Sequence, residues 1–252
     1  MSSGVYYFER VGSTMDLLHQ LAADGADAGT AVIAGEQLEG RGSRGRSWHS
    51  PPGGLWLSVL FRPPTLEGLE VMSLRAGMAV ADAVDAVVPE ALQLKWPNDL
   101  MLRGRKVGGV LCEARWQGDS LGWITVGVGL NVRNGTPDEL SSVATSLGAD
   151  QPGLTPEMLA PRVLTALREL DIRRGQLSSP ELKQFAVRDW LRGRLIRGPV
   201  AGTVRGVSED GALLVLTTAG TDISLRSGPV ELADSHTAGT SDHAAHARHR
   251  QH

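Results

Sequence analysis

Apolar residues recur at helical spacing in four segments of the chain. These segments cover residues 15–24, 71–88, 156–170 and 180–191. The first follows Ser13 and Thr14, either of which is a good N-cap residue, and Gly25 ends it. The second is rich in alanine, methionine, leucine and valine and ends before Pro89, which predicts a long buried helix. The last two are amphipathic and begin at prolines, as helices often do.

Short apolar runs bounded by glycine, proline or polar residues predict five strands. These runs are residues 30–34, 55–61, 92–96, 106–115 and 121–132. The first two strands flank a segment rich in glycine and arginine, residues 40–48, which we call the arginine loop. Helices and strands in this order predict an α+β fold, with a mixed, largely antiparallel β-sheet and flanking helices.

The pattern changes near residue 191. From there to residue 232, apolar runs shorten to 199–204, 212–217 and 221–225, and glycine-containing turns separate them. Such runs favour tight hairpins and a small SH3-like β-barrel. We therefore expect a domain over 1–190, a C-terminal SH3-like domain over 191–232, and a tail over 233–252.

That tail holds little apolar material and five of the seven histidines, so we expect it to be disordered. Histidine-rich tails bind divalent metal weakly, but a solvated terminus is the simpler interpretation.

Composition restricts the class of protein. With 41% hydrophobic and 21% charged residues, the chain is typical of a soluble globular protein. A net charge of −3 argues against general affinity for nucleic acid. Cys112 is the only cysteine, the start lacks the features of a signal peptide, and no apolar run reaches the roughly 18 residues that span a bilayer. We expect a cytoplasmic protein without a membrane partner.

The arginine loop has the chemistry of an anion site. Its glycines allow backbone N–H groups to approach phosphate or carboxylate oxygens, and its three arginines add permanent positive charge. The loop matches G-x-G-x-x-G, but a dinucleotide fingerprint must open a helix, and Trp48 is followed by Pro51 and Pro52. The loop also lacks the Gly-Lys-Ser/Thr of a P-loop. A solvated surface loop is the alternative, although Trp48 could stack on a base.

A second candidate segment begins at the predicted strand 92–96. Asn98 and Asp99 lie where a carboxylate and an amide can meet Mg²⁺ or a ribose hydroxyl, although a plain Asn-Asp turn explains them equally. Lys106 opens an apolar strand that contains Gly108 and Gly109, so its ammonium could bind an anion on a rigid sheet. The alternative is a strand-end lysine that faces solvent.

Together these segments resemble the biotin protein ligases. The motifs that carry the resemblance are Ser13-Thr14, Gln37, Gly40-Arg41-Gly42, Gly45-Arg46, Trp48, Lys95-Trp96-Pro97-Asn98-Asp99, Lys106, Gly108-Gly109 and Gly127-Val128-Gly129-Leu130-Asn131. Their order and spacing agree over roughly residues 11–232. The resemblance implies the class II synthetase and biotin–lipoate ligase type of fold.

It also implies a two-step activity. Biotin and MgATP would form biotinyl-5′-adenylate and pyrophosphate, and a lysine of a biotin carboxyl carrier domain would then attack the adenylate. Two anions must meet in one pocket in the first step, which agrees with the local positive charge.

The family pattern assigns roles to particular residues. It places in the biotin pocket Ser13, Thr14, Gln37, Arg41, Gly42, Ser43, Lys106, Gly108 and Gly109. It places at the nucleotide Arg44, Arg46, Trp48, Asn98, Asp99, Lys106 and Asn131. Lys106 and Arg41 are the expected catalytic residues, and Asp99 is the expected magnesium ligand.

Two positions depart from the family pattern. Ser43 stands where an arginine is usual, and that arginine helps to retain the adenylate. Our hypothesis is that Arg44 substitutes for it or that the intermediate leaks. Met15 replaces the usual asparagine after Ser13 and Thr14.

The resemblance also bears on partners. The ligase pattern begins near Val11, which leaves no room for the DNA-binding domain of some members, so we expect no specific DNA binding and a monomer or weak homodimer. A lipoate or octanoate ligase or transferase is the alternative enzyme, and Cys112 would be its candidate nucleophile. An RNA-binding module is the alternative from another class, although aromatics make up only 4% of the chain.

Overall fold

The computed structural model describes residues 3–63, 68–149 and 151–233, so the predicted tail lies outside the described residues except for Ala233. The main sheet consists of β1 (Val5–Val11), β2 (Ala31–Gln37), β3 (Leu55–Phe61), β4 (Gln93–Lys95), β5 (Asp99–Leu102), β6 (Arg105–Gln117) and β7 (Ser120–Leu130). Their order across the sheet is β1-β2-β3-β7-β6-β5-β4. Only the β1–β2 pair is parallel within this sheet. The predicted mixed, largely antiparallel sheet is confirmed.

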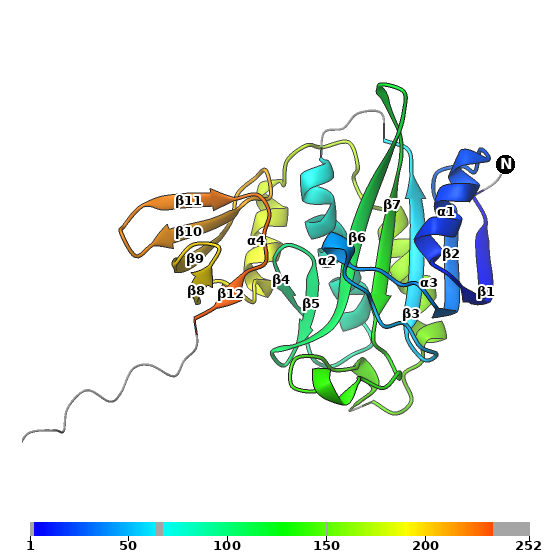
Figure 1. Cartoon of the computed structure of the whole chain (residues 1–252), viewed down its shortest axis with the longest axis horizontal. Coiled ribbons are helices and arrows are strands. Elements are labelled where there is room, and N and C mark those ends of the chain that lie inside the picture. Colours follow the sequence, from blue (N-terminus) through cyan, green and yellow to red (C-terminus); the bar gives the residue numbers. More distant parts are fainter. Residues whose placement is uncertain (1–2, 64–67, 150, 234–252) are drawn as a thin grey trace, which may run out of the picture.

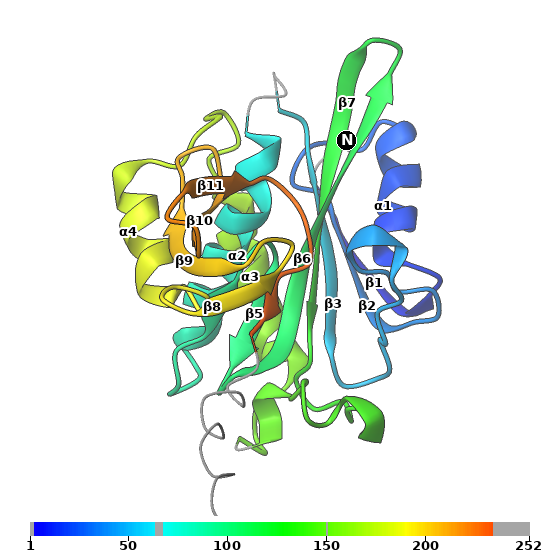
Figure 2. The same ribbon diagram turned by 60° about the vertical axis from the view of Figure 1, so that its left-hand side comes forward.

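Helices cover both faces of this sheet (Figure 2). On one face, α1 (Thr14–Ala23) packs Leu18 and Ala22 against Val32, Leu60 and Trp123. On the other face, α2 (Leu69–Asp85) and α3 (Pro156–Arg168) complete a larger cluster of buried residues. All seven residues of β3 are buried, because both faces of this strand are covered.

A second, five-stranded antiparallel sheet lies beside α4 (Ser179–Arg188), at the left of Figure 1. It consists of β8 (Leu195–Gly198), β9 (Gly202–Val207), β10 (Leu213–Thr217), β11 (Asp222–Leu225) and β12 (Glu231–Leu232), in the order β11-β10-β9-β8-β12. The strand pairs of the described residues do not include one between β11 and β12.

The two sheets share one continuous core. Ile196, Val204 and Leu213 of the second sheet belong to the same buried cluster as the α2 face of the first. The indole of Trp96 also donates a hydrogen bond of 2.9 Å to the carbonyl of Gly211. The second sheet is therefore packed onto the strand end at residues 92–96.

Several elements differ from the sequence prediction. Strands β1, β5, β8 and β12 were not predicted, and α4 ends at Arg188 instead of residue 191. The predicted strands 106–115 and 121–132 form a long hairpin, β6–β7, which projects beyond the helices (Figure 1). No helix in the described part of the chain is long and apolar enough to cross a membrane.

Candidate functional site

A cavity of about 480 Å³ opens on the face of the main sheet that α1 covers only in part. The predicted site residues that line it are Ser13, Thr14, Gln37, Arg41, Gly42, Ser43, Arg46, Trp48, Asn98, Asp99, Lys106, Gly109 and Asn131. Two predicted residues do not line it, Arg44 and Gly108. A Cβ on Gly108 would lie 2.5 Å from Leu130 Cδ2, so this glycine faces packed side chains.

A row of small residues forms the floor of the cavity. Asp99, Gly109 and Gly129 lie abreast on β5, β6 and β7. A Cβ on Gly129 would lie 2.6 Å from Trp48 Nε1, and one on Gly109 would lie 3.8 Å from Lys106 Nζ. Gly129 therefore provides the space in which the Trp48 ring lies on the sheet, because any side chain there would displace the ring.

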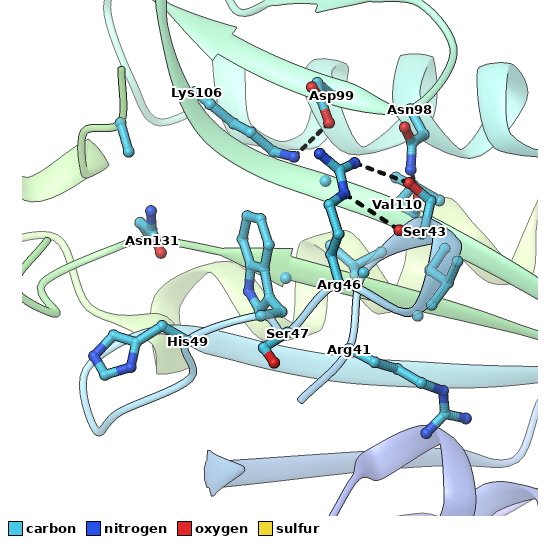
Figure 3. A pocket seen from close by; sticks show the side chains of 18 of the residues that line it. Arg41, Ser43, Arg46, Ser47, His49, Asn98, Asp99, Lys106, Val110 and Asn131 are labelled. Carbon is cyan, nitrogen blue, oxygen red and sulfur yellow. Dashed lines mark hydrogen bonds and ion pairs between the residues drawn. The ribbon is translucent and has the colours of Figure 1, made fainter. Parts of the chain in front are cut away.

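One end of the cavity is cationic. Lys106 Nζ lies 2.5 Å from Asp99 Oδ1 (Figure 3). The same Nζ lies 4.9 Å from the centre of the Trp48 ring. Lys95 also lines the cavity, and burial lowers its pKa, because desolvation disfavours the charged ammonium. With Arg46, these lysines form what we call the cationic end, which suits carboxylate or phosphate groups.

At the opposite end, hydroxyl and amide groups line the cavity, and Arg41 lies beside Ser13. Thr14 donates from its backbone N and from Oγ1 to Gln37 Oε1, both at 2.9 Å. Ser58 Oγ lies 2.8 Å from Thr14 Oγ1, and Gln37 Nε2 donates to Ser50 Oγ at 3.0 Å. Thr14, Gln37 and Ser58, with Ser13, line the cavity here and form what we call the neutral end. It suits an uncharged polar group with donors and acceptors.

Apolar groups lie between the two ends. Met15 and Leu111 line this middle part of the cavity. Met15 is 4% exposed, and a Cβ on Gly127 would lie 2.7 Å from its sulfur. The cavity therefore suits an elongated ligand with a neutral polar head, an apolar body and an anionic tail.

The arginine loop folds back on itself above the sheet. Arg41 and Ser47 form an isolated antiparallel bridge, and Gly42 N donates to Arg46 O at 2.8 Å. Ser43 to Gly45 form a single 3-10 turn, in which Arg44 has a φ of 63°. Arg46 donates to the Ser43 carbonyl at 3.3 Å and to Ser43 Oγ at 3.1 Å (Figure 3). The arginine whose side chain binds Ser43 is therefore Arg46.

Arg41 binds acidic side chains. Its Nε and Nη2 donate to the two carboxylate oxygens of Glu113 at 2.8 and 3.0 Å, and its Nη1 lies 2.8 Å from Asp16 Oδ2. These partners raise the pKa of Arg41, the hydrogen bond to Glu113 being the largest cause. In Figure 3 the side chain extends away from Lys106 and Asp99. The Arg41 charge is therefore paired with carboxylates of the protein, and its role at a bound ligand stays a prediction.

Sequence reasoning missed Glu113 and His19. Glu113 accepts from Arg41 and lies 3.0 Å from His19 Nε2. Its pKa lies well below the usual range, because His19 and then Arg41 stabilise the carboxylate. A single carboxylate within the apolar strand 106–115 was the available signal. Nothing in the sequence pairs it with His19, which is 94 residues away.

The two predicted asparagines support the cavity wall. Asn98 Nδ2 donates to Val110 O at 2.8 Å (Figure 3). Asn131 Nδ2 donates to Thr145 O at 3.1 Å, and Asn134 donates to Asn131 Oδ1 at 3.0 Å. Each of these two amides therefore uses one of its N–H donors on a carbonyl within the protein.

The side chains near Asp99 could bind magnesium only together with oxygens from a bound nucleotide and water. Among the described residues, no group of three or more histidine, cysteine, aspartate or glutamate side chains could hold a metal ion. Mg²⁺ in nucleotide sites commonly takes one or two carboxylates and draws its other ligands from phosphate and water. Asp99 can supply one such carboxylate at the cationic end.

Cys112 lies on the other face of the sheet from this cavity. Its sulfur accepts a hydrogen bond from Ser73 of α2 at 3.5 Å, and burial raises the pKa of the thiol to about 11. A thiol that is protonated at neutral pH is a poor nucleophile.

Comparison with known proteins identifies relatives over most of the chain. A model of the biotin/lipoate A/B protein ligase family matches residues 7–131. The biotin–[acetyl-CoA-carboxylase] ligase of Mycobacterium tuberculosis is 34% identical over 239 residues, which cover 88% of this chain and 86% of the relative. The bifunctional ligase/repressor BirA of Bacillus subtilis is 31% identical over 235 residues, which cover 87% of this chain and 71% of the relative.

Solved structures show the same fold. The biotin protein ligase of Aquifex aeolicus, in complex with biotin and ATP, has a TM-score of 0.77 at 28% identity, with 93% of this chain and 100% of that chain covered. The biotin protein ligase of Leishmania major, in complex with biotinyl-5-AMP, has a TM-score of 0.63 at 27% identity, with 89% and 99% covered.

Proposed function

Because the chain belongs to the biotin protein ligase family, we propose that it activates biotin with ATP and transfers the biotinyl group to a lysine of a biotin carboxyl carrier domain. The relatives named for biotin and the solved complexes with biotin and ATP support this proposal.

The observation that carries the proposal is the polarity of the cavity. Biotin has a neutral ureido ring, an apolar body and a carboxylate tail. The neutral end offers hydroxyl and amide groups for the ureido ring, and the apolar middle offers Met15 and Leu111. The cationic end would receive the carboxylate together with the phosphates of ATP.

Lys106 has the central role in the first step. A carboxylate oxygen attacks the α-phosphorus, the bond from phosphorus to the bridging oxygen breaks, and pyrophosphate leaves. Both reacting groups are anions, so a cation between them lowers the barrier. The Lys106 ammonium, held 2.5 Å from Asp99 at the edge of the glycine row, would supply that charge.

The second step needs an exposed acyl carbon. The ε-amine of the carrier lysine attacks this carbon, the bond to the adenylate oxygen breaks, AMP leaves, and the amine loses a proton to solvent. In this step Lys106 would stay on the phosphate of the leaving AMP.

Magnesium would bind at Asp99 together with phosphate oxygens, where it would neutralise pyrophosphate. Asn98 and Asn131 would support the wall behind the nucleotide, and Trp48 would cover its base. The carrier, a cytoplasmic location and the absence of specific DNA binding stay part of the proposal.

The test is release of pyrophosphate from ATP in the presence of biotin, lipoate, octanoate or no acid. We expect release with biotin alone, and we expect Lys106→Ala to lower it by roughly 100-fold or more, which is typical for the loss of a group that stabilises developing charge. Release with lipoate or octanoate but not biotin would point to the lipoate branch of the family. Cys112→Ser is the matched control and should keep wild-type activity.

A further inference from the structure

His19 lies on the buried side of α1, behind the arginine loop. Its Nε2 lies 3.0 Å from Glu113 Oε2 and 3.2 Å from Thr125 Oγ1. Its Nδ1 accepts a hydrogen bond of 2.9 Å from the indole of Trp123. The Lys106 chemistry proposed above uses none of these side chains.

The contacts of His19 fix its tautomer. An indole N–H can only donate, so Nδ1 must keep its lone pair toward Trp123. The proton of the neutral ring is then on Nε2, where Glu113 accepts it. The ring is thus held as a donor to one particular carboxylate.

That carboxylate holds the arginine loop. Glu113 binds Arg41 through two parallel hydrogen bonds, and Arg41 also donates to Ser13 Oγ at 3.2 Å. Because the bridge from Arg41 to Ser47 closes the loop on itself, the guanidinium fixes the base of the whole loop. We propose that His19 and Glu113 are positioning residues that hold Arg41, and through it the arginine loop, over the neutral end of the cavity.

The contacts that run from His19 through Glu113 to Arg41, which we call the relay, are strengthened by burial. The side chains of His19 and Glu113 are 10% and 19% exposed, so water competes little for the bond between them. The other charged groups at Glu113 are Arg41 and Arg115, and Asp16 binds Arg41 from α1. Without the N–H of His19, Glu113 Oε2 would lose a hydrogen-bond donor. The Glu113 carboxylate would then hold the Arg41 guanidinium less firmly.

The inference rests on the proposed function, because its measurement is the Kd for biotin, determined by calorimetry on the full chain. We expect His19→Leu to weaken biotin binding by about tenfold, the effect of one hydrogen bond to a charged group. His19→Gln keeps a donor near the position of Nε2 and should bind nearly as wild type. Leu159→Ala, in α3 on the other face of the sheet, is the control, because it removes a buried side chain and lowers Tm without touching His19, Glu113 or Arg41.

A double-mutant cycle separates this role from a structural one. If His19 acts through Arg41, His19→Leu should change Kd by less than about twofold in an Arg41→Ala background. Glu113→Gln should weaken binding in the wild-type background and likewise add little to Arg41→Ala.

The outcomes distinguish the two proposals. Wild-type Kd in both His19→Leu and Glu113→Gln would overturn the relay while the proposed function stands. Equal losses in His19→Gln and His19→Leu, or an equal loss in Leu159→Ala, would also overturn it. Failure of the wild-type chain to bind biotin would overturn the proposed function itself.

Discussion

Replacing Gly129 with alanine tests whether the floor of the cavity positions the Trp48 ring for nucleotide binding. An added Cβ would lie 2.6, 3.1 and 3.3 Å from Nε1, Cε2 and Cδ1 of Trp48. Gly129 is paired on both sides, with Trp56 of β3 and Gly109 of β6, so the strand cannot retreat. The indole must move instead, and it then leaves its place 4.9 Å from the Lys106 ammonium.

Two interactions set the magnitude. A cation over an aromatic ring contributes about 0.5–2 kcal/mol, depending on desolvation. A base stacked on an aromatic side chain contributes about 1–3 kcal/mol. If the displaced ring loses roughly half of these two interaction energies together, binding of ATP weakens by about 1–2.5 kcal/mol. Since each 1.4 kcal/mol is tenfold, the KM for ATP should rise by about 5- to 70-fold.

The assay is the initial rate of pyrophosphate release at saturating biotin, with ATP varied. We expect the KM for ATP to rise and the KM for biotin to stay within about twofold, because the neutral end is untouched. Gly153→Ala is the control, because a Cβ at that position meets nothing within 4 Å. An unchanged KM for ATP in Gly129→Ala, or an equal rise in the KM for biotin, would refute this account of the cavity floor.

Three further results are expected. Gly127→Ala should raise the KM for biotin but not for ATP, because its Cβ would lie 2.7 Å from Met15 Sδ, and equal KM values in the two proteins would contradict this. Contacts with His19 and Arg41 hold the pKa of Glu113 below its ordinary value of 4.5, so they stabilise the fold above that pH and lose this effect as pH falls toward the lower folded-state pKa. Glu113→Gln should therefore lower Tm at neutral pH, with the difference shrinking between about pH 4.5 and pH 2, and a difference independent of pH would argue against the mechanism. Titration of labelled operator DNA at physiological salt should show no specific binding, and retention that survives added salt and competitor DNA would contradict that expectation.

Most of the main sheet could be predicted because its strands are continuous apolar runs. Both faces of β3 are covered, so its seven residues are all apolar or small. Strand β1 was missed because it is an edge strand, and its central residues Tyr6, Tyr7 and Phe8 are exposed. Strand β5 was missed because Asn98 and Asp99 have the composition of a turn.

Some residues of the site could be predicted from the sequence and others could not. Motif residues on one loop or strand, such as Trp48 and Lys106, were predicted, and the structure brings them to one cavity. The partners of Arg41 were not predicted, because Glu113 is 72 residues away and meets it only through strand pairing in the folded sheet. The sequence therefore indicated the cationic end more fully than the acidic side chains that hold the arginine loop.

The most direct test of the central claim is the mass of a biotin carboxyl carrier domain after incubation with the full chain, ATP and biotin. We predict the addition of one biotinyl group, dependent on ATP and absent when the target lysine of the carrier is replaced by arginine. A carrier that stays unmodified while pyrophosphate is released would contradict the claim.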